Sequence, residues 1–124
     1  ESGNQVIIED WLEGEEVSVH AICDRDSFHL FPLVRDHKRE LENDEGKMTG
    51  GMGAVGPVNP KGLSSGIIKY RIIERTLEAL APKRNGVIYR GMLFPGLMHT
   101  KKGPMVLEYN CRFGDPETEV LVRL

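Results

Sequence analysis

Apolar residues recur at every second position near the start of the chain, which is the spacing of a half-buried β-strand. Val17, Val19 and Ala21 would share one face of a strand at 16–23, because successive side chains of a strand point to opposite faces. A shorter strand is expected at 5–10. A polar turn at 24–27 would let 28–34 return antiparallel. The first third of the chain therefore predicts a strand, a bend and a hairpin.

Helical spacing appears once, just after the middle of the chain. The residues of this stripe recur three and four positions apart, and they are Ile68, Ile72, Ile73, Leu77 and Leu80. Pro82 follows the last of them, which is typical of a helix end. The apolar segments 89–100 and 104–110 flank a Lys-Lys-Gly turn and predict a second hairpin. Asp115 as a cap and Pro116 in the first turn predict the start of another helix.

Between these elements, the segment 35–66 shows no periodicity. It begins with a charged run and continues with six glycines between Gly50 and Gly66. Irregular segments of this length are uncommon in compact domains and usually serve as a lid or a binding loop. We therefore expect a binding loop here.

Composition limits the class of protein. The chain has 124 residues, of which 40% are hydrophobic and 28% charged, and its net charge is −3. That suits one globular domain and argues against a nucleic-acid binder, which would carry a basic excess. No apolar run reaches the roughly 18 residues of a membrane span. Without a signal-peptide pattern at the start, a cytoplasmic protein with reduced cysteines is expected.

Acidic residues gather where the first strand is expected to end, in the segment Glu9-Asp10-Trp11-Leu12-Glu13-Gly14-Glu15-Glu16. A strand that breaks at a bend exposes backbone groups that can pair with an adenine edge, and a later acid can bind ribose hydroxyls. Acidic bends are also common as plain solvated turns, so these residues alone leave both interpretations open. Trp11 is expected in the core or in a pocket wall.

Glu108 and Asn110 stand two positions apart at the end of a predicted strand, so both side chains would point to the same face. Carboxylate and amide oxygens suit Mg²⁺, which keeps waters and substrate phosphates as its other ligands. Arg112 stands two positions after Asn110, so its side chain would point to the same face, where it could stabilise the charge that develops in phosphoryl or acyl transfer. The alternative is a Glu–Arg ion pair without a metal.

The long irregular segment holds a third candidate, in which Asp36-His37-Lys38-Arg39 precedes Thr49-Gly50-Gly51-Met52-Gly53. Closely spaced glycines let backbone amides approach an anion, and the cations could neutralise phosphate or carboxylate groups. The spacing matches neither a P-loop nor a dinucleotide fingerprint, so a flexible loop is the alternative. His20, His29 and His99 lack spaced partners and are expected to be structural.

The order of these motifs resembles one enzyme family. The succession EDWLEGEEVSV, DHKR, TGGMGAVGP, YRGMLFPGLM and VLEYNCRFGDPETEV closely resembles the phosphoribosylamine-glycine ligases, the glycinamide ribonucleotide synthetases of the ATP-grasp superfamily. The resemblance implies an α+β fold, the later part of an ATP-grasp domain, with a mostly antiparallel sheet of about five strands and one long helix. It also implies that 1–124 is one partial domain, truncated at both ends.

The resemblance further implies roles for individual residues. ATP would be bound by Glu9, Asp10, Trp11, Leu12, Glu16 and Leu107. Glu108 and Asn110 would bind Mg²⁺, with Mn²⁺ as an alternative, and Arg112 would be the catalytic residue facing the γ-phosphate. The glycine and 5-phosphoribosylamine site would be bordered by Asp36, His37, Lys38, Arg39, Thr49, Gly50, Gly51, Gly53 and Asp115.

The activity implied is ATP-dependent ligation of glycine to 5-phosphoribosylamine in purine biosynthesis, through glycyl phosphate. The partners would be these small molecules and the missing parts of the parent chain, with neither nucleic acid nor membrane, and the chain by itself is expected to be inactive. Another ATP-grasp carboxylate-amine ligase and a non-catalytic nucleotide-binding module stay open as alternatives. Many ATP-grasp enzymes carry a further metal-binding acid on the strand before Glu108, where this chain has Gly96.

Overall fold

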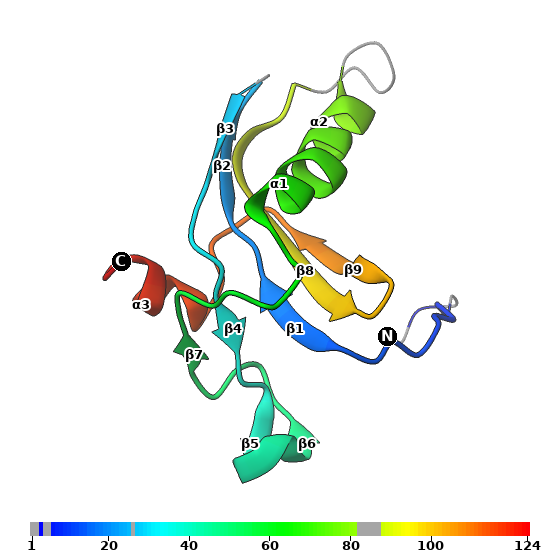
Figure 1. Cartoon of the computed structure of the whole chain (residues 1–124), viewed down its shortest axis with the longest axis vertical. Helices are drawn as coiled ribbons and strands as arrows, with labels where there is room; N and C mark the ends of the chain where they lie inside the picture. The colour runs from blue at the N-terminus through cyan, green and yellow to red at the C-terminus, as the bar shows by residue number, and fades with distance from the viewer. Residues whose placement is uncertain (1–2, 4–5, 26, 82–87) are drawn as a thin grey trace.

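The 11-residue strand β8 (Arg90–Thr100) is the centre of a five-stranded sheet in the computed structural model, which describes residues 3, 6–25, 27–81 and 88–124. One side of β8 pairs antiparallel with β9 (Gly103–Asn110). The other side pairs with β1 (Glu15–Ser18) and β2 (Ala21–Asp24), which follow one another along it. β3 (Ser27–Leu30) pairs with β2 (Figure 1). The α+β class and both predicted hairpins are confirmed.

β1 and β2 form one strand with a short interruption, since both keep a single register along β8. Val17, for example, lies opposite Leu97. At the interruption the Val19 N–H donates to the Pro95 carbonyl at 3.2 Å. Proline has no N–H with which to return the second bond of the ladder. The strand predicted at 16–23 is therefore confirmed, with a break that the position of Pro95 explains.

Around Ser18 and His20 both faces of this strand are buried, whereas the sequence predicted a half-buried strand, which holds farther along at the exposed Ile22. Ser18 and His20, on the face opposite the core residues, are only 8% and 0% exposed. The cause is the segment 114–117, because Ser18 hydrogen-bonds to Glu117 and His20 to Gly114. Alternation of residue types cannot reveal a covering segment so distant in the sequence.

The strand predicted at 5–10 is wrong for the part that the structure describes. Residues 6–10 have no regular structure, and residue 5 lies outside the described residues. Ile7 and Ile8 are 83% and 94% exposed, and among the described residues no strand pairs with them. An extended segment needs a neighbour for its backbone hydrogen bonds, which explains the failure. Trp11 is 86% exposed, which excludes the core, but it lines a pocket, so the second of its two predicted places is confirmed.

A helix over 65–80 packs on the sheet (Figure 1), as predicted. It consists of α1 (Ser65–Ile68), a π-helical stretch η2 (Lys69–Ile73) and α2 (Glu74–Leu80). The Ser64 hydroxyl caps it by accepting from the Ile67 N–H at 3.3 Å. Pro82 lies outside the described residues. The core joins the helix to the sheet through Val17, Val19, Ala21, Cys23, Leu63, Ile68, Ile72, Ile73, Leu93 and Leu97.

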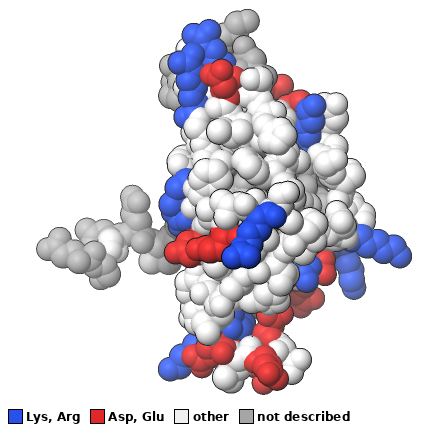
Figure 2. All heavy atoms as spheres, turned by 90° about the vertical axis from the view of Figure 1, so that its left-hand side faces the viewer, with Lys and Arg blue, Asp and Glu red and all other residues white. Residues whose placement is uncertain are grey.

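The segment 35–66, predicted to lack regular structure, contains two small ribbons. The first pairs β4 (Arg35–Asp36) with β7 (Ala54–Val55), and the second pairs β5 (Arg39–Leu41) with β6 (Glu45–Met48) across the 3-10 turn η1 (Glu42–Asp44). Strands of two to four residues are too short to show a periodic pattern. At the lower end of Figure 2, where β5 and β6 lie, acidic and basic side chains are mixed.

The C-terminal helix α3 (Glu117–Leu121) is confirmed, but its predicted cap is wrong. Pro116 takes the N-cap position, and no side-chain hydrogen bond caps the helix there. The Thr118 hydroxyl bonds instead to the Gly114 carbonyl, one turn back. Because Pro116 precedes the helix and does not begin it, Asp115 is one residue too distant to act as the cap.

Candidate functional site

The predicted metal-binding pair lies at the end of β9. The Asn110 side-chain amide donates to the Glu108 carboxylate at 3.2 Å, so the two side chains point to one face. Gly96 of β8 lies directly opposite Glu108, and a Cβ built on Gly96 would be 3.5 Å from the Glu108 Cγ. The position for a further acid is therefore beside Glu108, and glycine occupies it.

A pocket of about 260 Å³ opens in front of this strand end. Glu9, Glu16 and Leu107, predicted from opposite ends of the chain to bind ATP, line it together with the predicted metal ligand Glu108. The remaining lining residues come from β1, β8 and the segment after β4, and they are Val17, Ser18, Lys38, Phe94, Gly96 and Leu97. The fold thus brings Glu9 and Glu16 of the acidic bend and Glu108 of the strand end to a single cavity, whose lining does not include Asn110.

A second, larger pocket of about 680 Å³ shares Glu16, Lys38 and Leu107 with the first. Its lining includes Asp10, Trp11 and Leu12 of the acidic bend. Opposite them the lining includes Asp36, His37, Lys38 and Arg39. The two segments that the sequence assigned to ATP and to the acceptor substrates therefore face one another.

The basic run and the glycine-rich run are hydrogen-bonded along their backbones. The His37 N–H donates to the Gly53 carbonyl at 2.9 Å, and the Thr49 N–H donates to the Lys38 carbonyl at 2.7 Å. The Thr49 hydroxyl also donates to Lys38 at 2.8 Å, and the Gly51 N–H donates to that hydroxyl at 3.2 Å. This pairing makes the two runs one hydrogen-bonded unit.

Glycine is required at position 51 of that unit. Its φ is +131°, a conformation that other residues rarely adopt. A Cβ there would lie 2.6 Å from the Cδ of Pro116 and 3.0 Å from the nearer Asp36 carboxylate oxygen. The glycine-rich run therefore packs directly over Asp36 and beside Pro116. Asp115, the neighbour of Pro116, is exposed at the same edge.

Asp36 is a buried carboxyl group without full hydrogen bonding. It is 8% exposed, and its buried Oδ1 has no hydrogen-bond partner in the described part of the chain. Burial, and then repulsion from Glu117, raise the pKa of Asp36 to about 6, while Lys38 acts in the opposite direction. The Asp36 carboxyl group therefore takes up a proton at a higher pH than an exposed aspartate does.

Lys38 supplies positive charge to both pockets. Its ammonium group lies 3.2 Å from a Glu16 carboxylate oxygen. Burial acts to lower the pKa of Lys38, but attraction to Glu16, and then to Asp36 and Glu108, outweighs it and raises the pKa. The side chain therefore stays protonated at neutral pH.

Arg112, the predicted catalytic residue, does not line either of these pockets. It is exposed, and its guanidinium donates to the Phe113 carbonyl at 2.9 Å. In the described ranges no ion pair joins it to Glu108, so the alternative of a Glu–Arg pair is wrong. Its assignment to the γ-phosphate stays a prediction.

The sequence did not point to Glu117 as a residue near the site. It is 2% exposed and accepts a 2.7 Å hydrogen bond from the Ser18 hydroxyl. A Cβ on Gly114 would lie 2.3 Å from its other carboxylate oxygen, so the segment 114–117 passes very close to this acid. Charged residues at the start of a helix are ordinary in sequence, and nothing in the local pattern marks this one as buried.

His20 is part of the same buried polar cluster. Its Nε2 accepts from the Gly114 N–H at 3.1 Å, so the neutral ring carries its proton on Nδ1. The ring stacks on Phe94 with 4.1 Å between centroids. Burial lowers the pKa of His20 to about 4, with Glu117 opposing the shift. The predicted structural role of His20 agrees with these contacts.

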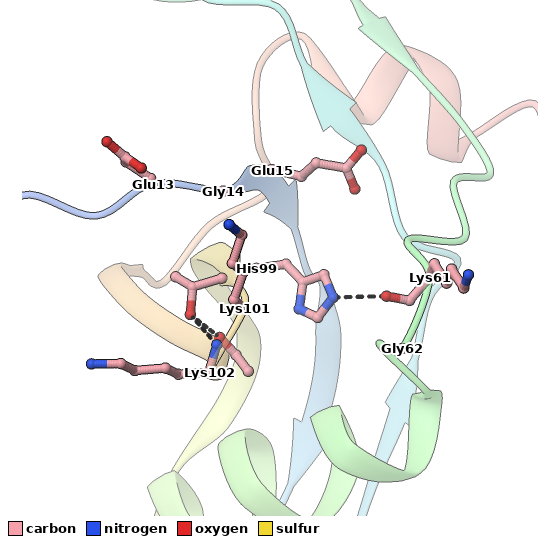
Figure 3. Close-up of a pocket in the computed structure, with 10 residues that line it drawn as sticks. Glu13, Gly14, Glu15, Lys61, Gly62, His99, Lys101 and Lys102 are labelled. Atoms are coloured by element: carbon pink, nitrogen blue, oxygen red, sulfur yellow. Dashed lines mark hydrogen bonds between the residues drawn. The ribbon is translucent and has the colours of Figure 1, made fainter.

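A third pocket, of about 720 Å³, lies at the turn between β8 and β9. Figure 3 shows His99 pointing toward Lys61, whose carbonyl lies 3.0 Å from the His99 Nε2. Lys101, Lys102 and Glu13 also line it, but none of the predicted ATP, metal or substrate residues does. We therefore place the candidate site in the first two pockets.

The donor atoms at the strand end fit Mg²⁺ in type but are few. Glu108 and Asn110 offer hard oxygen atoms, and within the described residues no group of three or more His, Cys, Asp or Glu side chains could hold a metal. A cation here would take its other ligands from water and substrate phosphates, which is the usual arrangement for Mg²⁺ at phosphate-transfer sites.

Comparison with solved structures defines the class of the fold. A phosphoribosylamine–glycine ligase from Thermotoga maritima superposes with a TM-score of 0.81 and 42% sequence identity, over 94% of this chain and 29% of that chain. Together with the pocket that joins the acidic bend to Glu108 and the match to an ATP-grasp family model, this similarity defines an ATP-grasp domain.

The family follows from the sequence. Residues 1–118 match the model for the phosphoribosylglycinamide synthetase ATP-grasp (A) domain, and the chain belongs to this family. A phosphoribosylamine–glycine ligase from Leptospira interrogans is 42% identical over 99% of this chain and 29% of its own length. A trifunctional purine biosynthetic protein adenosine-3 from Bos taurus is 46% identical over the whole chain and 12% of its own length. The chain thus spans less than a third of these relatives. In the described parts, no helix is long and apolar enough to cross a membrane.

Proposed function

We propose that the protein containing this chain ligates glycine to 5-phosphoribosylamine at the expense of ATP. The observation that carries the proposal is the 260 Å³ pocket, in which Glu9, Glu16 and Leu107 meet Glu108. Family membership and the ligase names of the relatives supply the substrates. The products are glycinamide ribonucleotide, ADP and phosphate, and the expected location is the cytoplasm.

The chemistry begins with activation of the glycine carboxylate. A carboxylate oxygen is a poor leaving group, so it first attacks the γ-phosphorus of ATP and gives glycyl phosphate and ADP. The amine of 5-phosphoribosylamine then attacks the acyl carbon and displaces phosphate. The contribution of the protein is positioning and stabilisation of charge.

The two pockets divide the binding tasks. The acidic bend holds the nucleoside, with Glu9, Asp10 and Leu12 at the adenine and Glu16 at the ribose. Glu108 and Asn110 hold Mg²⁺, which neutralises phosphate charge when bound. The unit formed by 36–39 and 49–53, with Asp115 at its edge, borders the acceptor substrates.

Phosphate release by the full-length protein tests this function. We expect release to require ATP, glycine and 5-phosphoribosylamine together. A panel of other carboxylates and amines serves as the control. Turnover with a different pair would assign the protein to another ATP-grasp ligase, and ATP binding without turnover of any pair would favour a non-catalytic nucleotide-binding module.

A further inference from the structure

His20 joins the middle of the sheet to a segment near the other end of the chain. It lies at the interruption between β1 and β2 and is fully buried. Its Nε2 accepts from the Gly114 N–H at 3.1 Å, across 94 positions of sequence. Because this hydrogen bond is buried, loss of the acceptor would leave the Gly114 N–H unpaired at a cost in free energy. The position of this N–H therefore depends on the imidazole.

The Gly114 N–H belongs to the same peptide group as the Phe113 carbonyl. A trans peptide group is planar, and its N–H and C=O point in opposite directions, so an acceptor that holds the N–H also orients the carbonyl. The Arg112 guanidinium donates to this carbonyl at 2.9 Å. Two hydrogen bonds thus connect His20 to Arg112 through one rigid peptide group.

Aromatic neighbours hold the His20 ring in place. The ring stacks on Phe94 with 4.1 Å between centroids and 21° between planes, and Phe94 lines the 260 Å³ pocket. It also stacks on Phe113 at 6.3 Å and 18°. Aromatic rings attract one another at such separations. His20 therefore contacts both a wall of the pocket and the residue whose carbonyl binds Arg112.

Arg112 is an exposed side chain whose direction needs a fixed partner. In the part of the chain that the structure describes, no carboxylate pairs with it, and the Phe113 carbonyl is its acceptor. A guanidinium has five N–H donors, so this bond leaves most of them available to phosphoryl oxygens. We propose that His20 is a positioning residue that orients Arg112 toward the transferred phosphoryl group through the peptide group between Phe113 and Gly114, an inference that rests on the proposed function.

This role involves no proton transfer by His20. The neutral ring accepts one hydrogen bond, and Arg112 stays charged throughout. An arginine that is already oriented loses less side-chain freedom when the transition state forms. Loss of the anchor should therefore lower kcat more than it weakens the binding of ATP.

The first test compares His20→Leu with Val19→Ala in the full-length protein. Leucine fills the space against Phe94 but cannot accept the Gly114 N–H. We expect kcat to fall about 10-fold or more, the effect typical of losing a partner that orients a functional group, with the KM for ATP within about threefold of the wild type. Val19 is a buried core residue beside His20 on the opposite face of the strand. Val19→Ala should lower the melting temperature but leave kcat within about twofold, at a temperature where circular dichroism shows both variants folded.

A double variant tests whether His20 acts through Arg112. If it does, adding His20→Leu to Arg112→Lys should lower kcat by no more than about twofold, because the group that His20 positions is already lost. A full additional loss would show that His20 acts elsewhere and would overturn the proposal.

Three results of the first test would also overturn it. An unchanged kcat for His20→Leu would show that the Gly114 N–H needs no histidine acceptor. An equal fall in kcat for Val19→Ala would make the effect one of general stability. A higher KM for ATP with unchanged kcat would mean that His20 acts on nucleotide binding through Phe94. In each of these cases an active wild type leaves the proposed function intact, whereas an inactive wild type would remove the proposed function itself.

A polar pair of variants covers the case in which His20→Leu does not fold. The side-chain carbonyl of glutamine reaches about as far as Nε2, whereas that of asparagine reaches only as far as Nδ1, and both can accept a hydrogen bond. We expect His20→Gln to keep kcat within about threefold of the wild type and His20→Asn to lose about tenfold. Equal kcat values for these two variants would contradict an anchor formed through Nε2.

Discussion

The contributions of His20 and Asp36 to the free energy of unfolding are expected to change with pH in opposite directions. Replacing one of the two residues should therefore reveal the contribution of the other. Burial lowers the pKa of His20 from 6.5 to about 4, so the unfolded state binds this proton more tightly. His20 therefore reduces the free energy of unfolding as pH falls from 6.5 to 4. Burial raises the pKa of Asp36 from 3.8 to about 6, so the folded state binds this proton more tightly. Asp36 therefore increases the free energy of unfolding as pH falls from 6 to 3.8.

The two contributions are similar in size. One pKa unit corresponds to about 1.4 kcal/mol, so each shift of roughly two units contributes about 3 kcal/mol at its full extent. In the wild type the two largely cancel between pH 6 and pH 4. Relative to the wild type, Asp36→Asn should lose about 2 to 3 kcal/mol between pH 7 and pH 4, because only His20 still titrates. His20→Gln should gain a similar amount, because only Asp36 still titrates.

Urea unfolding followed by circular dichroism at several pH values measures these slopes. Comparing each variant with the wild type removes the contributions of other acids, which the variants share. Asp24→Asn is the control, because Asp24 is an exposed acid at the far end of β2 whose side chain is 74% accessible. If the free energy of unfolding of Asp36→Asn changes with pH in the same way as that of the wild type, the inference that Asp36 is buried and that its titration is coupled to folding is refuted.

Three further predictions concern the proposed site. In the full-length protein, Glu16→Gln should raise the KM for ATP about tenfold with little change in kcat, because a ribose contact is equally strong in the ground and transition states; a large fall in kcat alone would give Glu16 a catalytic role. Arg112→Lys should lower kcat without changing the Mg²⁺ requirement, because it keeps the charge but loses the planar fork; steady-state rates at several Mg²⁺ concentrations check this. The 124-residue chain by itself should show no measurable ligase activity in a phosphate-release assay, because Trp11 and Glu9 are exposed and leave bound nucleotide open to water; turnover near that of the full-length protein would contradict it.

The sequence predicted the features that depend on short spacing. The helix stripe of Ile68, Ile72 and Ile73 is buried as expected, and Glu108 and Asn110 share a face because a strand places alternate side chains together. The turn of the β8–β9 hairpin also agrees, because Gly103 adopts a φ of +110°, which glycine tolerates.

Contacts between distant residues could not be predicted from the local pattern. Ser18 and Glu117 are 99 positions apart, and their bond buries a face of β1 that the sequence marked as polar. The ion pair between Lys38 and Glu16 likewise depends on how the β4–β7 ribbon lies against β1. The strand predicted at 5–10 was wrong because a contact was missing: an apolar segment becomes a strand only when another strand lies beside it.

A titration of ligase rate against Mg²⁺ shows whether Glu108 binds the cation that accompanies ATP. Glu108→Gln keeps the shape of the side chain and removes its charge, and Gly96 opposite it offers no substitute ligand. We expect the Mg²⁺ concentration for half-maximal rate to rise about 10-fold to 100-fold, with activity partly restored at high Mg²⁺. A Mg²⁺ dependence identical to that of the wild type would show that Glu108 is not a metal ligand.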